Sequence, residues 1–320
     1  MTDPSSLPPE LVQALTGMYG VPAVAVPWID RFLEPLELEL VAALARGPLT
    51  IPQAAGRLST PVSPAFFERA YRRGVINRPT PDVVSSADFH ARFEIWAMFD
   101  GWKDVPAEVR DQLLEWDLAH YVAERRVQIT ALRAGERPQI GLENSEYLLL
   151  HEAEALIART EHVYLWPCDC RAMAGRCAKP LYVCLRFDND RGLGWEISHE
   201  RAVEVLREAD RAGLMHTGEA AGVVPDSWKP TAICNCCTDC CYPHLAAERL
   251  DTQGEWPRSR YVAALHRDRC TGCGRCTHRC PSAADILFEP ALCRGCGLCA
   301  TGCPEEAITM TPLPAASLTR

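Results

Sequence analysis

The stretch HRDRCTGCGRCTHRCP at residues 266–281 is repeated in similar form as EPALCRGCGLCATGCP at residues 289–304. The two copies align without a gap at an offset of 23 residues, the distance from residue 266 to residue 289. Cysteines, two glycines and the closing proline all superimpose, so each copy reads C-x2-C-x2-C-x3-C-P. A repeat this regular predicts two copies of one local structure built around the cysteine side chains.

The spacing within each copy is typical of a ligand set for a [4Fe–4S] cluster. Three thiolates from one tight loop can cap three irons of a cube, and the glycines allow the backbone to turn closely around it. The fourth cysteine, followed by proline, leaves the loop and can reach a second cube. Zinc is the alternative, but zinc sites usually combine C-x2-C pairs separated by a longer loop, so we favour iron–sulfur.

The repeat resembles bacterial-type dicluster ferredoxins, and the resemblance implies an α+β ferredoxin domain at residues 256–320 with two [4Fe–4S] clusters. In that family each loop gives three ligands to one cluster and its fourth cysteine to the other. The first expected cluster is held by Cys270, Cys273, Cys276 and Cys303, and the second by Cys293, Cys296, Cys299 and Cys280. The activity implied is one-electron transfer to or from a partner protein.

All 17 cysteines of this 320-residue chain lie at or beyond residue 168. The chain has no apolar run long enough for a membrane helix, and its acidic, proline-rich start does not resemble a secretory signal. We therefore expect a cytoplasmic protein in which reduced cysteines bind metal rather than form disulfides. The net charge of −9 argues against general binding to nucleic acid or to anionic membranes.

Nine cysteines lie outside the repeat, in two groups. The first group is in WPCDCRAMAGRCAKPLYVC at residues 166–184, and the second is in ICNCCTDCC at residues 233–241. Between them, residues 197–214 predict an amphipathic helix that Ser198 caps and Gly213 ends. We expect two loops that this helix brings together.

Three interpretations of these nine thiols compete: a further iron–sulfur cluster, one or more zinc sites, and a dithiol or persulfide redox site. Thiolates packed this densely repel one another unless cations neutralise them, which favours a metal over free thiols, and we favour a cluster. The expected ligands are Cys168, Cys170, Cys234 and Cys236. Further candidates are Cys177, Cys184, Cys237, Cys240 and Cys241.

The same cysteine pattern, over residues 145–245, resembles a region that directly precedes the ferredoxin domain in a family of iron–sulfur proteins of anaerobic bacteria and archaea. The resemblance implies cluster binding and electron transfer but no particular reaction. With the periodicity of the remaining chain, it predicts a multidomain, mainly α fold with small β elements. We expect a flexible arm at residues 1–32 and a helical, cysteine-rich metal-binding domain at residues 96–255.

Between these two parts, residues 33–95 predict three short helices followed by a small β element, and weakly resemble a winged helix-turn-helix domain. If this domain binds DNA, the third helix offers Arg69, Arg72 and Arg73, with Arg57 and Arg78 nearby for phosphates. The alternative is a packing or docking module, which we favour because the chain is acidic overall.

The sequence thus predicts an iron–sulfur electron-transfer protein that exchanges electrons with a partner oxidoreductase. No G-x-G-x-x-G or GxxxxGK[ST] fingerprint is present, so a stand-alone reductase with a common nucleotide cofactor has little support, and we assign no catalytic residue. One alternative is a redox-responsive DNA-binding regulator that uses the N-terminal winged helix. Another is an electron-delivering subunit of a larger oxidoreductase.

Overall fold

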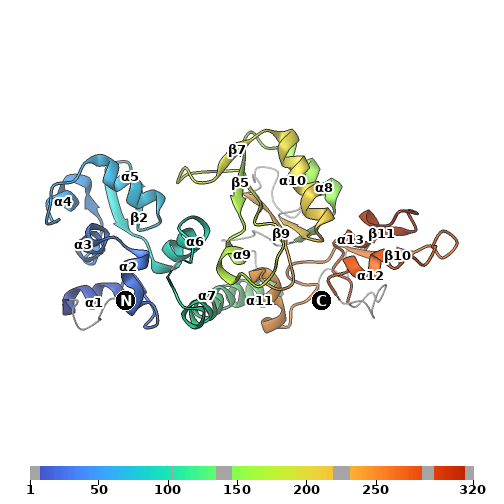
Figure 1. The fold of residues 1–320 in the computed structure, drawn as a ribbon, viewed down its shortest axis with the longest axis horizontal. Helices are drawn as coiled ribbons and strands as arrows, with labels where there is room; N and C mark the ends of the chain where they lie inside the picture. Colours follow the sequence, from blue (N-terminus) through green and yellow to red (C-terminus); the bar gives the residue numbers. More distant parts are fainter. Residues whose placement is uncertain (1–7, 103, 135–145, 219–230, 283–291, 314–320) are drawn as a thin grey trace. The chain divides into compact units, whose positions relative to one another are not determined.

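The computed structural model describes residues 8–102, 104–134, 146–218, 231–282 and 292–313, and the chain divides into two compact units (Figure 1). Unit 1 comprises Met1–Ala119 with two short additions, Ala172–Ala174 and Arg191–Leu193. Unit 2 comprises His120–Arg171, Gly175–Asp190 and Gly194–Arg320. This division differs from the four expected domains, because the cysteine-rich region and the ferredoxin repeat share one unit.

The first part of unit 1 forms packed helices, where we expected a flexible arm. They are α1 (Pro9–Thr16), the 3-10 helix η2 (Val26–Trp28) and α2 (Ile29–Phe32). Leu15, Tyr19 and Phe32 are completely buried, and the ring of Phe32 lies 4.5 Å from that of Trp96. The expectation was wrong for residues 8–32 because it weighed the prolines and overlooked the large apolar side chains between them, which belong to the core.

The next part of unit 1 alternates short helices and strands. The elements are α3 (Pro35–Leu44), β1 (Leu49–Thr50), α4 (Ile51–Ala55), α5 (Pro64–Arg72), β2 (Ile76–Thr80) and β3 (Val83–Ser86). The three strands form an antiparallel sheet in the order β1–β3–β2. Thr50 caps α4, since its side chain accepts a hydrogen bond from the backbone N–H of Gln53 at 3.4 Å. Helix α6 (Phe89–Phe99) follows in unit 1, and α7 (Ala107–Arg133) begins in unit 1 and continues into unit 2.

Unit 2 is built on a six-stranded sheet. Its strands are β4 (Glu146–Leu148), β5 (Val163–Pro167), β6 (Tyr182–Arg186), β7 (Trp195–Ile197), β8 (Met215–Gly218) and β9 (Ala232–Cys236). They follow the order β4–β8–β9–β6–β5–β7, and every neighbouring pair is antiparallel. We expected a helical middle region, but it contains this six-stranded sheet beside its helices, and the fold mixes helices and sheets. The strands are only three to five residues long, and two carry cysteines that we had placed in loops.

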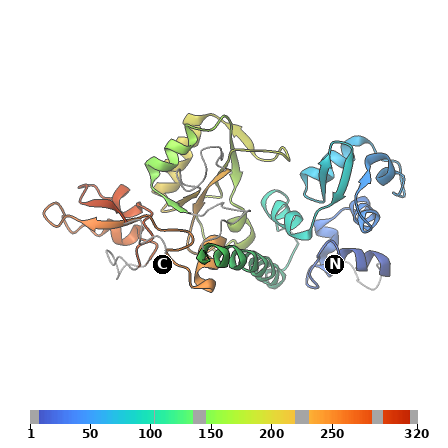
Figure 2. The same ribbon diagram turned by 180° about the vertical axis from the view of Figure 1, so that it is seen from behind.

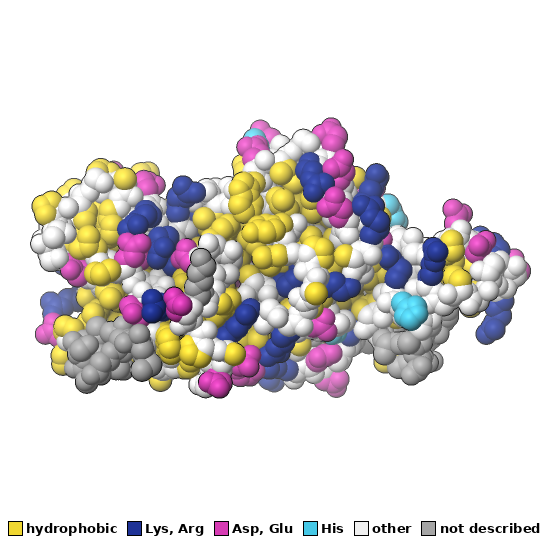
Figure 3. All heavy atoms as spheres, in the orientation of Figure 1, with side chains coloured by type: hydrophobic (Ala, Val, Ile, Leu, Met, Phe, Trp, Pro, Cys, Tyr) yellow, Lys and Arg dark blue, Asp and Glu magenta, His cyan; other side chains and the backbone are white. Residues whose placement is uncertain are grey.

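Two helices pack on one face of this sheet, α8 (Leu150–Ile157) and α10 (His199–Arg211) (Figures 1 and 2). The expected boundaries of α10 are confirmed: the Ser198 side chain accepts a hydrogen bond from the N–H of Arg201 at 3.2 Å, and Gly213 has a φ of +73°. On the outer side of α10, basic and acidic side chains lie side by side (Figure 3).

The alternation of side chains along β9 separates its cysteines from this helical face. Residues 233 and 235 point to one side of a strand and residues 234 and 236 to the other. Asn235 meets the ring of His216 at 2.6 Å, and His216 lies 4.0 Å from Asp210 on α10. Cys234 and Cys236 therefore face away from α10. This second face also receives α9 (Asp169–Ala174) and α11 (Tyr242–Leu250), which begin next to further cysteines.

The C-terminal part of unit 2 contains the repeat. Its elements are β10 (Tyr261–Leu265), α12 (Arg275–Arg279), α13 (Leu298–Thr301) and β11 (Ile308–Pro312). β10 and β11 pair antiparallel, with Tyr261 opposite Pro312. Both short helices start after a glycine with positive φ, Gly274 at 71° and Gly297 at 79°, so the two copies have the same local structure. No helix in the described ranges is long and apolar enough to cross a membrane.

Candidate metal centres

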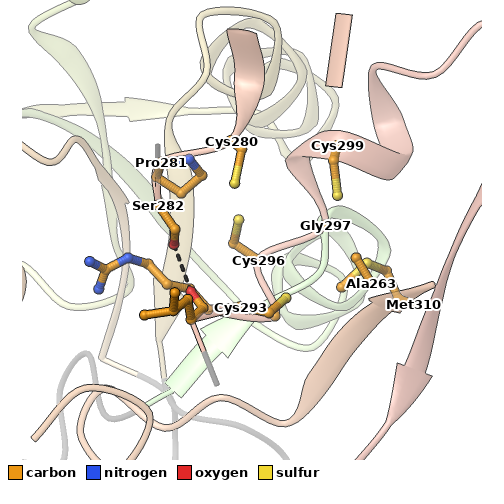
Figure 4. A pocket seen from close by; sticks show the side chains of 12 residues that line it. Ala263, Cys280, Pro281, Ser282, Cys293, Cys296, Gly297, Cys299 and Met310 are labelled. Atoms are coloured by element: carbon orange, nitrogen blue, oxygen red, sulfur yellow. Dashed lines mark hydrogen bonds between the residues drawn. The ribbon is translucent and has the colours of Figure 1, made fainter. Parts of the chain in front are cut away.

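Four cysteines of the repeat surround one pocket, and Figure 4 shows their side chains around its interior. Cys280 follows α12, whereas Cys293, Cys296 and Cys299 come from the loop and helix of the second copy. Ala263 of β10 and Met310 of β11 contribute apolar walls. Four thiols on an apolar pocket are the donor set that a [4Fe–4S] cluster requires, so these residues fit that group.

The other four repeat cysteines lie nearer to solvent. Cys270 and Cys273 are exposed, while Cys276 and Cys303 are half-buried against an apolar cluster that includes Ile308. Backbone N–H groups point at two of these sulfurs: Gly272 donates to Cys270 Sγ at 3.4 Å, and Ala307 donates to Cys303 Sγ at 3.3 Å. Such N–H groups stabilise the negative charge of a thiolate ligand.

The sheet register brings distant cysteines of the middle region together. β6 pairs with β9 so that Leu185 lies opposite Ile233 and Arg186 opposite Ala232. Continuing this register by one residue places Cys184 across from Cys234, and their side chains are hydrogen-bonded. Cys236 lies two residues further along the same face of β9.

Two helix N-termini add three more thiols to this face. Cys168 directly precedes α9, Cys170 lies in its first turn, and Cys241 directly precedes α11. Side-chain hydrogen bonds join Cys168 to Cys170 and to Cys184, and Cys236 to Cys241. Cys234 packs against the apolar cluster that contains Cys236 and Cys241, which connects the remaining members of the group. We name it the six-thiol set: Cys168, Cys170, Cys184, Cys234, Cys236 and Cys241.

The remaining three cysteines form a separate and more compact group, the three-thiol set: Cys177, Cys237 and Cys240. Cys177 Sγ lies 3.8 Å from Cys237 Sγ and 3.7 Å from Cys240 Sγ. All three sulfurs lie within 4.8 Å of one another. Cys237 and Cys240 belong to the turn between β9 and α11, whereas Cys177 belongs to the loop after α9.

The four expected ligands of the middle site thus do not form a separate group of four. Cys168, Cys170, Cys234 and Cys236 all belong to the six-thiol set, but they are linked there through Cys184 and Cys241. The candidates Cys177, Cys237 and Cys240 lie apart from them in the three-thiol set.

A buried arginine lies next to both sets and was missed by the sequence analysis. Arg171 is 4% exposed, and its guanidinium donates to the carbonyl oxygens of Pro180 at 2.7 Å and of Asn235 at 3.0 Å. Burial alone would lower its pKa, but the neighbouring sulfurs of Cys168, Cys237 and Cys184 raise it. The only sequence signal was its place directly after C-x-C, in CDCR.

Most of the middle thiols are held in the protonated form by their surroundings. A hydrogen bond with Cys168, together with burial, raises the pKa of Cys170, and a hydrogen bond with Cys236 and burial raise that of Cys241. Cys237 is the exception, because a hydrogen bond from Cys240 and the charge of Arg171 lower its pKa to about 4 despite burial. Deprotonating the whole group requires added positive charge, which a metal ion supplies.

The repeat and the middle region meet within unit 2. Cys296 of the repeat packs in one apolar cluster with Cys236 and Cys241 of the six-thiol set, and Tyr147, Met215 and Leu298 complete that cluster. Arg294 Nη1 also donates to the hydroxyl oxygen of Tyr147 at 3.3 Å. The pocket of Cys280, Cys293, Cys296 and Cys299 therefore lies beside the six-thiol set.

The arginines expected to contact DNA are engaged inside unit 1. Arg69 pairs with Glu34, Arg73 with Glu37 at 2.8 Å and Arg78 with Glu68. The other two donate to backbone carbonyl oxygens, Arg57 to that of Ala43 and Arg72 to that of Gly192, both at 2.9 Å.

Residues 286–309 match the family model described as "4Fe-4S binding domain". This stretch holds four cysteines of the second copy, Cys293, Cys296, Cys299 and Cys303. No curated protein and no solved structure matches the chain. The family match and the clustered cysteines together make the C-terminal part an iron–sulfur, ferredoxin-like region.

Proposed function

We propose that this protein transfers electrons through two [4Fe–4S] clusters of the repeat and a third cluster in the six-thiol set, in exchange with a partner oxidoreductase. The observation that carries the proposal is the shared apolar cluster of Cys296, Cys236 and Cys241. Ligands of two redox centres in van der Waals contact keep the path for an electron short. The proposed setting is the cytoplasm, where so many thiols stay reduced.

The residues of the repeat have distinct tasks in this proposal. Cys270, Cys273, Cys276 and Cys303 would hold one cluster, and Cys293, Cys296, Cys299 and Cys280 the other. Bound clusters supply the one-electron chemistry. Ala263 and Met310 shield the second ligand set from water, while the exposed thiols of the first set give a partner protein access.

The six-thiol set suits a cluster better than a single ion. Its thiols are hydrogen-bonded in pairs, and no three of its ligand atoms, all described, lie within 4.8 Å of one another. Ligands of a cube bind different irons and so lie further apart than ligands that share one ion. The set has two thiols more than one cube binds, so Cys184 and Cys241 are alternative ligands to the four that we predicted.

Iron analysis and reductive titration of the anaerobically purified full chain test the proposal. We expect about twelve irons and about three electrons taken up per chain, because each [4Fe–4S] cluster accepts one electron. Cys234→Ser, which removes one of the four predicted ligands of the third cluster, should reduce these numbers to about eight and about two, whereas Cys177→Ser, a cysteine outside the six-thiol set, should leave both unchanged.

Two results contradict the proposal at different levels. Eight irons in the wild-type chain would remove the third cluster and leave a dicluster ferredoxin. A chain without iron after anaerobic reconstitution would remove the electron-transfer function altogether.

For the N-terminal part, we propose a docking module for the redox partner rather than a DNA reader. Basic and acidic side chains lie beside one another over the N-terminal elements on the face that Figure 3 shows. DNA binding needs basic side chains that can turn to phosphates, and the five candidate arginines already have intramolecular partners. A gel-shift experiment with genomic fragments, with oxidised and reduced protein, should show no binding at moderate salt. A shift in either state would favour the redox-responsive regulator, with a winged helix at residues 33–95.

A further inference from the structure

We propose that Cys177, Cys237 and Cys240 bind one tetrahedral metal ion of the zinc class, at a site separate from the iron–sulfur clusters. The distances between the sulfurs carry this inference. A Zn–S bond of about 2.3 Å in a tetrahedral site places neighbouring sulfurs about 3.8 Å apart. Cys177 Sγ lies 3.7 Å from Cys240 Sγ and 3.8 Å from Cys237 Sγ, in agreement with that spacing.

The chain segments are also those that a zinc site uses. Cys237 and Cys240 are a C-x2-C pair in a turn between a strand and a helix, and the third ligand comes from a distant loop. Cys237 and Cys240 are 4% and 0% exposed, so the pair is fixed in the interior, whereas Cys177 is half-buried. The ion can enter from the side of Cys177, which lies nearer to solvent than the two buried ligands.

The charges balance around such an ion. Three thiolates with one divalent cation leave a single negative charge. The guanidinium of Arg171, hydrogen-bonded to Cys237, offsets that charge, and it is fixed by its bonds to the carbonyl groups of Pro180 and Asn235. A divalent ion thus neutralises a group of buried thiolates that is unstable without it.

The fourth position of the tetrahedron is open to solvent or to a small ligand. Among the described residues, no fourth cysteine, histidine or carboxylate joins the three sulfurs within 4.8 Å. A pocket lined by Cys237, Thr238 and Asp239, with Lys179 and Arg211, reaches one residue of the set, Cys237. Three protein ligands with one exchangeable position are typical of a reactive zinc site rather than a closed structural one.

Metal analysis of matched serine variants tests the inference. The wild-type chain, expressed with zinc and purified anaerobically, should contain about one zinc ion. Cys177→Ser should reduce zinc to background with the iron content unchanged, and Cys184→Ser should retain zinc. Cobalt replacing zinc should show the visible bands of a tetrahedral thiolate site in Cys184→Ser but not in Cys177→Ser.

A second measurement needs no variant and therefore does not depend on how Cys177→Ser folds. In wild-type protein, removing zinc with a selective chelator should make Cys177, Cys237 and Cys240 react together with an alkylating reagent, as read by mass spectrometry. Equal alkylation before and after chelation would overturn the inference, as would iron in place of zinc at this set. The zinc content is measured independently of the iron content. If the chain binds no zinc, the proposed electron transfer through iron–sulfur clusters is therefore not contradicted.

Discussion

The two copies of the ferredoxin repeat have the same cysteine spacing and different surroundings. Cys273 of the first copy is exposed, whereas the equivalent Cys296 is 8% exposed. The residue after the second glycine of the motif is Arg275 in the first copy, which is exposed, and Leu298 in the second copy, which is completely buried. The second copy packs against the cysteine face of the six-stranded sheet, whereas Arg279 of the first copy contacts α10.

This difference teaches that ligand spacing and ligand environment are separate properties. The spacing determines which thiols can reach one cluster. Burial, nearby charge and hydrogen bonds set the potential and the access of a partner, and these differ between the copies. We therefore expect the exposed copy to meet the partner and the buried copy to face the six-thiol set. Four predictions test that contrast, in order of decreasing effect.

Metal removal should affect the two copies unequally. With a slow iron chelator, the three loop thiols of the first copy should become alkylated before the three loop thiols of the second, because access governs attack on cysteine ligands. The loop thiols are Cys270, Cys273 and Cys276 in the first copy and Cys293, Cys296 and Cys299 in the second. Mass spectrometry of the tryptic peptides at increasing times gives the order. Simultaneous labelling of Cys273 and Cys296 would mean that burial does not distinguish the copies.

Leu298→Ala and Arg275→Ala change the same position of the two copies. Leu298→Ala should lower the free energy of unfolding by about 2–5 kcal/mol, since it leaves a cavity in a buried cluster. Arg275→Ala removes an exposed side chain and should cost at most about 0.5 kcal/mol. Chemical denaturation of the cluster-loaded proteins measures both. A similar loss in the two variants would contradict the asymmetric docking.

Gly295→Ala and Gly272→Ala compare equivalent turns. Both glycines have positive φ, 68° and 69°, so each alanine should cost about 1 kcal/mol in backbone strain. A Cβ at position 295 would also lie 2.5 Å from the carbonyl oxygen of Tyr261, whereas nothing lies within 4 Å of one at position 272. The first variant should therefore lose a further 1–3 kcal/mol or so. Thermal unfolding of both variants checks the order.

Arg279 of the first copy forms an ion pair with Asp210 of α10, and replacing it tests how much this contact stabilises the protein. Its Nη2 lies 2.7 Å from Asp210 Oδ2, and its Nε donates to the carbonyl oxygen of Leu298 at 2.7 Å. Arg279→Ala should cost about 1.5–3 kcal/mol, because it removes the arginine partner of the buried carboxylate of Asp210. Combining it with Asp210→Ala should recover part of the loss. Additive losses in the double variant would show that the two side chains do not interact in solution.

The N-terminal part shows how local signals succeed and fail. Thr50 caps α4 and Pro64 is the first residue of α5, because capping and the fixed φ of proline act over only a few residues. Whether residues 8–32 fold depends on what Leu15, Tyr19 and Phe32 pack against, and those partners are distant in sequence. The prolines alone favoured a flexible arm, but packing against residues distant in sequence buries these side chains in the core.

The amino-acid sequence by itself determined the repeat and its two cysteine-rich loops, because two or three residues separate successive thiols and two glycines shape each loop locally. It also determined the capped helix α10 and the concentration of thiols in the middle region. Only the tertiary structure decided how those nine thiols divide. Cys184 meets Cys234 through strand register, and Cys177 meets Cys237 and Cys240 through a loop some sixty residues away. Pairing across a sheet is a long-range property, and residue spacing alone does not encode it.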